Sequence, residues 1–371
     1  AKEFFSDIGE LVPFSGRELN AEQVGDADIL LVRSITKVNE ALLKFNKKLL
    51  FVGTATIGID HIDQEYLLKR NIPFSSAPGC NAISVAEYVL SALVILAEQK
   101  LFNVLDLTVG IIGAGNTGTR LSEKLCALGI KHVMHDPLLE QQGDNRQFVS
   151  LSQALACDVV SLHVPLTRSG NFPTFHLLNE ERLRALSGNQ ILINACRGEV
   201  IDNQALLALK KQGMKTSIIL DVWENEPFID PILAKHVFMG TPHIAGYSFD
   251  GKVAGTEMIY RALCQHLGLP ERFNSGQFLE DPALSKMAFT STADIDWCIH
   301  TAIRACFDVR HDHSLLPSTL SPTETERGAA FDSFRKSYRC RREFSGVKIQ
   351  LKQVDSELHS KFRALGFNVK T

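Results

Sequence analysis

The chain has 371 residues, of which 45% are hydrophobic and 22% charged, a composition typical of globular proteins with two or three domains. The formal net charge is −3 and no basic run stands out, so we expect no nucleic-acid and no membrane partner. The eight cysteines form no C-x-x-C pair, which favours reduced thiols in the cytoplasm over disulfides or a zinc site. We also expect no membrane span, because no uninterrupted apolar run reaches about 18 residues.

Apolar runs that resemble strands alternate along the chain with helical patterns, which predicts parallel sheets covered by helices. From about Asn274 onward this alternation is lost, and we predict a separate C-terminal domain there. The expected strands lie within residues 27–34, 49–56, 108–112, 131–137, 157–165, 189–198, 215–224 and 236–246, and the clearest helices within 84–100, 119–129 and 203–213.

A glycine-rich loop, "GAGNTG", follows the apolar run 108–112 and precedes a helical pattern. Gly113 would permit a tight turn, Gly115 would let the backbone approach a pyrophosphate, and Gly118 would let the helix pack closely on the strand. Asp136 ends the next strand, where a carboxylate can accept from ribose hydroxyls. No arginine adjoins Asp136 to hold a 2′-phosphate, so the sequence predicts NAD in preference to NADP.

Three more polar residues follow later strands of the same predicted sheet: Arg197, Glu226 and His243. Because ligands of open α/β sheets bind at the carboxyl ends of strands, these side chains could converge on one crevice. An arginine can clamp a carboxylate in a bidentate fork, and a carboxylate beside a histidine favours its charged form. Together they suit the oxidation of an alcohol next to a carboxylate, with His243 taking the hydroxyl proton. Each residue alone could equally be a surface, capping or turn residue.

These motifs, in this order and spacing, resemble those of the NAD-dependent D-isomer-specific 2-hydroxyacid dehydrogenases. The resemblance covers most of the first 270 residues, and the tail of about a hundred residues resembles a dimerisation domain found in one branch of that family. Relatives open with a short strand ahead of a helix near Ala1, and that strand is absent here, so we expect an incomplete substrate domain. The motifs that carry the resemblance are "GAGNTG", "LHVPLT", "NACRGEVID", "LDVWENEP" and "TPHIAGYS".

The resemblance implies a role for each site residue. Arg197 would bind substrate, Glu226 would tune the histidine, and His243 would be the proton donor and acceptor. Cys196, where many relatives have serine, is interpreted as a small packed residue because hydride transfer needs no nucleophile. The implied substrate contacts are Ser34, Thr56 and Tyr247, and the implied NAD contacts are Gly113, Gly115, Asn116, Thr117, Gly118, Asp136, Val164, Ala195, Asp221 and Gly246.

The predicted fold class is α/β, with two Rossmann-like doubly wound domains and a C-terminal α+β dimerisation domain. Residues 1–84 and 250–270 would form the substrate domain, residues 85–249 the NAD domain and residues 271–371 the C-terminal domain. The substrate would sit in the cleft between the first two domains, whose closure would exclude water. We expect a cytoplasmic homodimer that uses NAD, binds no metal and acts on a small phosphorylated 2-hydroxy acid.

Other polar groups leave alternatives open. Arg33 and Lys37 flank Ser34, and either could meet a substrate phosphate or simply lie in solvent. Residues 311–313, "HDH", offer no third spaced ligand for a metal ion. The basic stretch 334–344 is interpreted as a solvated face.

Two alternative functions remain. One is an enzyme similar to D-3-phosphoglycerate dehydrogenase. The other is a non-catalytic protein that senses NAD and binds partners, since fold alone does not separate it from an enzyme. The presence of all three catalytic candidates favours the enzyme.

Overall fold

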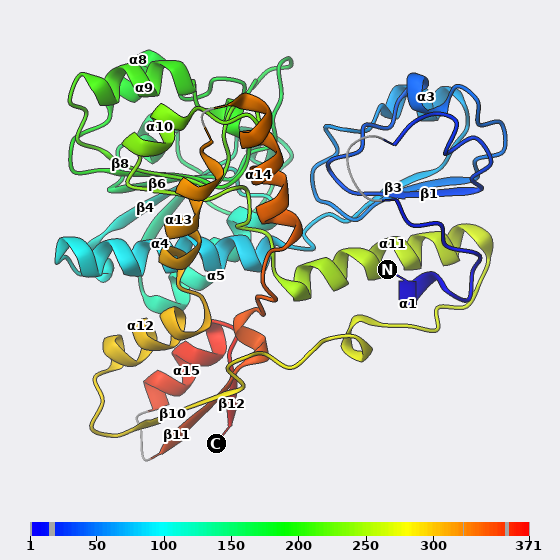
Figure 1. The fold of residues 1–371 in the computed structure, drawn as a ribbon. Helices are drawn as coiled ribbons and strands as arrows, with labels where there is room; N and C mark the ends of the chain where they lie inside the picture. Colours follow the sequence, from blue (N-terminus) through cyan, green and yellow to red (C-terminus); the bar gives the residue numbers. More distant parts are fainter. Residues whose placement is uncertain (1, 15–18, 322, 353–355, 371) are drawn as a thin grey trace. The chain divides into compact units, whose positions relative to one another are not determined.

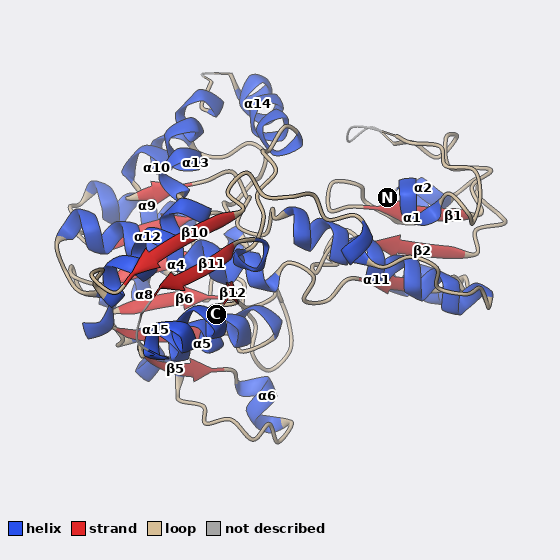
Figure 2. Cartoon of the chain, turned by 90° about the horizontal axis from the view of Figure 1, so that it is seen from below, coloured by secondary structure: helices blue, strands red, loops and turns tan. Residues whose placement is uncertain are grey.

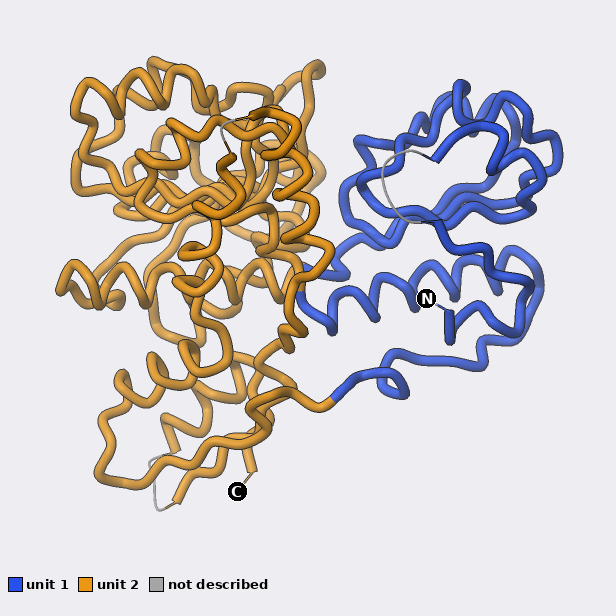
Figure 3. Tube along the Cα trace, in the orientation of Figure 1, with its two compact units in different colours: residues 1–81, 248–280 blue, residues 82–247, 281–371 orange. Residues whose placement is uncertain are grey.

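The computed structural model describes residues 2–14, 19–321, 323–352 and 356–370 (Figure 1). Figure 3 shows the two compact units into which the chain divides. Unit 1 comprises Ala1–Asn81 and Ser248–Glu280, and unit 2 comprises Ala82–Tyr247 and Asp281–Thr371. The chain therefore passes from one unit to the other after residues 81, 247 and 280.

Unit 1 contains a parallel sheet in the order β1-β2-β3. The helix α11 packs closely on β2, since a Cβ added to Gly53 would lie 2.4 Å from Cγ2 of Ile259. A side chain at Gly53 would push the helix off the sheet. The elements of this unit are α1 (Lys2–Phe5), β1 (Ile29–Val32), α2 (Glu40–Leu43), β2 (Phe51–Thr54), α3 (Gln64–Lys69), β3 (Phe74–Ser76) and α11 (Phe249–Leu267).

Unit 2 is built on a second parallel sheet, with the described strands in the order β5-β4-β6-β7-β8-β9. The order reverses between β4 and β6, and in open α/β sheets such a switch point is where ligands bind. The strands are β4 (Thr108–Ile112), β5 (Lys131–His135), β6 (Val159–Leu162), β7 (Ile191–Asn194), β8 (Ser217–Leu220) and β9 (Met239–Gly240).

Helices cover both faces of this sheet, and the strands are buried on both sides. Along β7, Ile191 and Ile193 belong to one hydrophobic cluster and Leu192 to the other, as the two-residue period of a strand requires. The helices are α4 (Ala82–Lys100), α5 (Asn116–Leu128), α6 (Pro137–Gln141), α7 (Leu151–Leu155), α8 (Glu180–Ala185), α9 (Asn203–Lys211) and α10 (Pro231–His236).

The C-terminal part of unit 2 carries a further sheet in the order β10-β11-β12. All described strand pairings in this sheet are parallel. The sequence predicted an α+β arrangement for this segment, which does not specify parallel pairing. Figure 2 shows β10 and β11 as neighbouring arrows. The elements are β10 (Lys286–Thr290), α12 (Ile295–Cys306), α13 (Val309–Leu315), α14 (Glu324–Lys336), β11 (Lys348–Lys352), α15 (Ser356–Ala364) and β12 (Asn368–Lys370).

The C-terminal segment shares a hydrophobic core with the rest of unit 2. One cluster runs from α4 and α5 to Ile299, Ile303 and Phe362, so α12 and α15 pack on the helices that cover the large sheet. The sequence predicted a separate domain over residues 271–371; in the structure, burial joins residues 281–371 to residues 82–247 in one compact unit, and the domain bounds stay a prediction. The substrate-domain bounds predicted from the sequence, 1–84 and 250–270, lie near those of unit 1.

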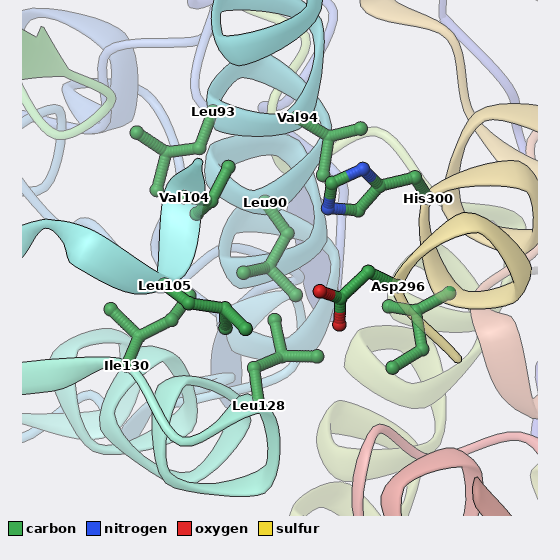
Figure 4. Close-up of a pocket in the computed structure, with 10 residues that line it drawn as sticks. Leu90, Leu93, Val94, Val104, Leu105, Leu128, Ile130, Asp296 and His300 are labelled. Carbon is green, nitrogen blue, oxygen red and sulfur yellow. The ribbon is translucent and has the colours of Figure 1, made fainter. Parts of the chain in front are cut away.

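Figure 4 shows the junction between α4 and α12. Leu90 and Val94 of α4 lie beside Asp296 and His300 of α12, around a hollow of about 10 Å³. That volume is about the smallest that can hold one water molecule. Burial lowers the pKa of His300. This hollow is a packing feature of the core and is too small for a substrate.

Among the described residues, one helix is long and apolar enough to cross a membrane by length and composition alone. It is α4, and 83% of its most apolar window is buried inside the protein. This burial identifies α4 as a core helix of unit 2. The predicted α/β fold class, with Rossmann-like parallel sheets and an additional C-terminal segment, is confirmed.

Candidate active site

The site residues predicted in unit 2 all follow strands of the large sheet. Because the strands are parallel, their carboxyl ends lie at one edge, and the sheet places these residues along it. The set comprises the glycine loop 113–118 after β4, Asp136 after β5, Val164 after β6, Ala195 and Arg197 after β7, Asp221 and Glu226 after β8, and His243, Gly246 and Tyr247 after β9.

The glycine loop has the shape that a dinucleotide requires. Gly113 has φ +93°, and a Cβ there would lie 2.6 Å from the carbonyl carbon of His163. A Cβ on Gly118 would lie 2.0 Å from the carbonyl oxygen of Gly113, so only glycine lets α5 start this close to β4. At Gly115, by contrast, a Cβ would meet nothing within 4 Å. That open space lies at the N-terminus of the 13-residue helix α5, where backbone N–H groups favour a phosphate.

Asp136 lies beside this loop. Its Oδ2 accepts from the backbone N–H of Ala114 at 2.9 Å, and its Oδ1 caps α6 by accepting from Leu139 N at 3.1 Å. The carboxylate is half-buried and is thereby held next to the glycine loop. This placement agrees with the ribose contact predicted from the sequence, which stays a prediction.

Arg146 is a neighbour of the glycine loop that the sequence did not reveal. Its Nη1 donates to the carbonyl oxygen of Ala114 at 3.0 Å and to Oγ1 of Thr119 at 2.8 Å. A bidentate pair with Asp144 fixes the guanidinium and lowers the pKa of that carboxyl to about 2. Arg146 therefore braces the loop. Only residues adjacent to Asp136 were considered in the sequence, and Arg146 lies ten residues further along the chain, so its contact with the glycine loop was not predicted.

Glu226 and His243 form the pair that the sequence predicts. Oε2 of Glu226 lies 2.7 Å from Nδ1 of His243, while its Oε1 accepts from the backbone N–H of Trp223 at 2.9 Å. Burial alone would raise the pKa of Glu226, but the charge and hydrogen bond of His243 and the charge of Arg335 hold it below its usual value. With Nδ1 turned to the carboxylate, the other ring nitrogen of His243 is the one left to exchange a proton with substrate.

Asp221 determines how the His243 loop is held. Its buried carboxylate accepts from Oγ1 of Thr241 at 2.6 Å and from the backbone N–H groups of Ile244 and Ala245 at 2.7 and 2.9 Å. His243 itself has φ +56°, a conformation rare for a residue with a side chain, and these bonds hold it there.

These bonds give Asp221 a positioning role for the His243 loop, since both carboxylate oxygens are engaged within the protein. The NAD contact predicted for Asp221 stays a prediction.

Arg197 is placed by an unusually close approach between two loops. A Cβ on Gly198 would lie 2.0 Å from the backbone carbon of Trp223, so glycine lets the loop after β7 rest on the loop after β8. The Arg197 side chain is half-buried, and its Nη1 donates to the carbonyl oxygen of Cys196 at 2.7 Å. The two loops that carry Arg197 and Glu226 are thus packed together.

Cys196 has no features of a nucleophile. Desolvation raises the pKa of its thiol to about 11, and Sγ donates to Oδ1 of Asn194 at 3.2 Å. A protonated thiol that already donates a hydrogen bond agrees with the packing role predicted from the sequence.

The remaining predicted substrate contacts differ in their surroundings. Tyr247 packs edge-on against Tyr338, with ring centroids 5.9 Å apart, and so meets the C-terminal segment. In unit 1, Ser34 is exposed after β1, whereas Oγ1 of Thr56 donates to the carbonyl oxygen of Gly58 at 2.8 Å. Substrate contact stays a prediction for all three residues.

Among the described residues, one group could hold a metal ion: His176, Asp202 and Glu224. Nε2 of His176 lies 2.7 Å from Glu224, while Nδ1 lies 3.6 Å from Asp202. The two carboxylates thus face different ring nitrogens, and the imidazole lies between them. The group links the loop carrying Glu224 to the rest of unit 2.

Two C-terminal groups of polar residues that the sequence singled out take part in the packing of this segment. Asp312 accepts from the Tyr338 hydroxyl at 2.9 Å and pairs with Arg339 at 3.2 Å, so it serves the packing of this segment. The stretch 334–344 is not simply a solvated face, because Arg335 is 8% and Arg341 2% exposed. The sequence signal for this burial was the mixture of aromatic and basic residues in the stretch 334–344. Such a mixture allows an arginine guanidinium to stack on an aromatic ring inside the protein.

Arg341 shows how closely this segment joins the site. Its Nη1 donates to the carbonyl oxygen of Ala245 at 3.1 Å, two residues after His243, and its Nη2 donates to Ser84 O at 2.6 Å. The C-terminal segment therefore supports the catalytic loop directly.

Comparisons with known proteins agree with this geometry. A sequence model of the D-isomer specific 2-hydroxyacid dehydrogenase NAD-binding domain matches residues 97–245, and a domain of unknown function matches residues 278–366. A relative from Marinobacter nauticus is 51% identical over 99% of this chain and 96% of its own length. The chain belongs to the D-isomer-specific 2-hydroxyacid dehydrogenase family, and is thus an NAD-dependent oxidoreductase that acts on a 2-hydroxy acid.

The relatives define the branch more narrowly. The Marinobacter nauticus protein is named erythronate-4-phosphate dehydrogenase, as is one from Colwellia psychrerythraea that is 52% identical over 95% of this chain and 93% of its own length.

Solved structures share the fold at lower identity. D-lactate dehydrogenase from Aquifex aeolicus, complexed with NAD and lactic acid, has a TM-score of 0.59 at 26% identity, over 72% of this chain and 91% of its own. NAD-bound 3-phosphoglycerate dehydrogenase from Entamoeba histolytica has a TM-score of 0.61 at 25% identity, over 75% of this chain and 93% of its own.

Proposed function

We propose that this protein oxidises 4-phospho-D-erythronate with NAD, giving (R)-3-hydroxy-2-oxo-4-phosphooxybutanoate in the biosynthesis of pyridoxal 5′-phosphate. The main support is the name shared by relatives at 43 to 52% identity, most of them aligned over nearly the whole chain. The main structural support for the proposed proton transfer is the Glu226–His243 pair, in which the carboxylate and the imidazole lie 2.7 Å apart.

The chain's own residues would divide the work as follows. His243 would remove the proton from the C2 hydroxyl, and Glu226 would stabilise the imidazolium that forms. Arg197 would hold the substrate carboxylate and polarise the reacting carbon. NAD, when bound, accepts the hydride from C2. In the reverse direction His243 would start protonated and return the proton.

Two features of the site favour NAD at the glycine loop. The open space at Gly115 lets a pyrophosphate approach the backbone, and Asp136 beside Ala114 offers a carboxylate to ribose hydroxyls. The same carboxylate would repel the 2′-phosphate of NADP.

Activity with two substrates tests this proposal. The purified protein is mixed with NAD and either 4-phosphoerythronate or 3-phosphoglycerate, and NADH absorbance is followed. We expect a clear preference for 4-phosphoerythronate. A preference for 3-phosphoglycerate would favour a phosphoglycerate dehydrogenase, and NAD binding without turnover of either would favour the alternative of an NAD-sensing interaction protein.

We further propose a cytoplasmic homodimer that associates through the C-terminal segment. Support comes from β10, a sheet-edge strand, and from Trp297 of α12, which is 54% exposed. Both line a hollow of about 650 Å³, and an exposed tryptophan next to an unpaired sheet edge suits an interface. Analytical ultracentrifugation of the full chain should give the mass of two chains, and Trp297→Glu should give one. Wild-type protein that sediments as a monomer at assay concentrations would contradict the proposal.

A further inference from the structure

One helix of the C-terminal segment lies on the loop that carries Glu226. A Cβ on Gly328 of α14 would lie 2.5 Å from Cε1 of Phe228, so the helix touches the loop two residues beyond Glu226. Phe331 is fully buried in the same hydrophobic cluster as Trp223. A helix repeats every 3.6 residues, so positions 328, 331 and 335 share the face of α14 that is turned to this loop.

Arg335 completes that face. Its guanidinium carbon lies 5.3 Å from the ring centroid of Tyr247 and 5.8 Å from that of Phe331, and the residue is only 8% exposed. Its charge also acts on Glu226, which places the guanidinium near the catalytic carboxylate. Arg335 therefore stacks on Tyr247 and acts on Glu226 through its charge.

The charge of Arg335 acts on Glu226, but the two oxygens of that carboxylate already bond Nδ1 of His243 and the backbone N–H of Trp223. Among the described residues, the buried Nε of Arg335 has no hydrogen-bond partner. Stacking on an aromatic ring recovers only part of the free energy that burial of a charge without a hydrogen-bonded partner costs. A guanidinium in this position is best explained by an anionic ligand that pairs with it when bound.

We propose that Arg335 binds the phosphate group of the substrate. This inference rests on the proposed function, in which Arg197 holds the carboxylate and the phosphate at the other end of the molecule still needs a cation. A guanidinium offers planar, paired donors that match phosphate oxygens better than an ammonium does. The C-terminal segment would then supply a residue that selects phosphorylated substrates. This would give a function to the segment 278–366, which matches a domain of unknown function.

Substitution of Arg335 tests the proposal with two substrates that differ only in the phosphate. Arg335→Met should raise KM for 4-phosphoerythronate roughly 10- to 100-fold, the loss expected when a charge-assisted hydrogen bond is removed. It should change kcat/KM for unphosphorylated erythronate less than about threefold, and Arg335→Lys should recover part of the loss. Lys336→Met, which removes an exposed charge one residue along α14, is the matched control and should leave KM unchanged.

A binding measurement keeps this test independent of turnover. Inorganic phosphate is titrated calorimetrically into the NAD-saturated full-length protein, and we expect binding to wild type and to Lys336→Met but not to Arg335→Met. If wild type failed to oxidise 4-phosphoerythronate, the proposed function would be wrong. The titration would still show whether Arg335 binds phosphate.

Three results would overturn the proposal. Equal losses with both substrates, together with a moved pH profile, would mean that Arg335 acts through Glu226. Undiminished phosphate binding by Arg335→Met would exclude the contact. A selective rise of KM in Arg33→Met but not in Arg335→Met would assign the phosphate to Arg33.

Discussion

Replacing Glu226 by glutamine should move the pH profiles of both reaction directions to lower pH. The substitution removes the negative charge 2.7 Å from Nδ1 of His243 and keeps most of the side-chain shape. Without that charge the protonated imidazole is less stable. Oxidation needs neutral His243, so its rise with pH should begin earlier. Reduction needs protonated His243, so its fall with increasing pH should also begin earlier, and reduction near neutrality should suffer most.

The size of the shift follows from the geometry. At an effective dielectric constant of about 20, two unit charges about 4 Å apart interact by roughly 4 kcal/mol. The side chains of His243 and Glu226 are 31% and 19% exposed, so water screens part of this attraction. Allowing for the screening leaves roughly 1.4 to 2.7 kcal/mol, which corresponds to about one to two pH units.

The assay is kcat/KM against pH in both directions, for wild type and Glu226→Gln. Glu224→Gln is the matched control, because Glu224 contacts His176 at the same distance of 2.7 Å but lies outside the pair. Its profiles should keep their position. If Glu226→Gln left both profiles in place, Glu226 would not be the partner that controls the proton of His243.

Four further substitutions probe the cofactor loop, Asp136 beside it and the support of the His243 loop. Gly115→Ala should weaken NAD binding at least about tenfold without lowering the thermal midpoint of the free protein. Gly118→Ala, whose Cβ would lie 2.0 Å from Gly113 O, should lower that midpoint. The reverse pattern in thermal melting and NAD titration would refute the loop assignment. Asp136→Ala should weaken NAD binding and narrow the preference over NADP, and equal use of NADP by wild type would contradict this role. Asp221→Asn should cost about 1.5 to 3 kcal/mol in the free energy of unfolding, because one of three donors loses its acceptor. Denaturant titration measures that loss, and a change within error would argue against the positioning role.

The sequence by itself determined the large sheet and its chemistry. Apolar runs bounded by polar residues marked the buried parallel strands, and the glycine spacing 113, 115, 118 marked the dinucleotide turn. These signals are local, since a strand buried on both faces and a turn with positive φ each restrict the residue types within a few positions. The placement of Glu226 beside His243 also followed, because the residues after parallel strands share an edge.

Only the tertiary structure decided how the C-terminal segment relates to the site. The short strand β3 and the parallel sheet of β10 to β12 carried weak patterns, and the burial of Arg335 and Arg341 ran against the general exposure of arginine. Arg341 reaches Ala245 across 96 positions of sequence, and Arg146 reaches Ala114 across 32. Such contacts depend on which surfaces the packed helices bring together, and no window of sequence contains both partners.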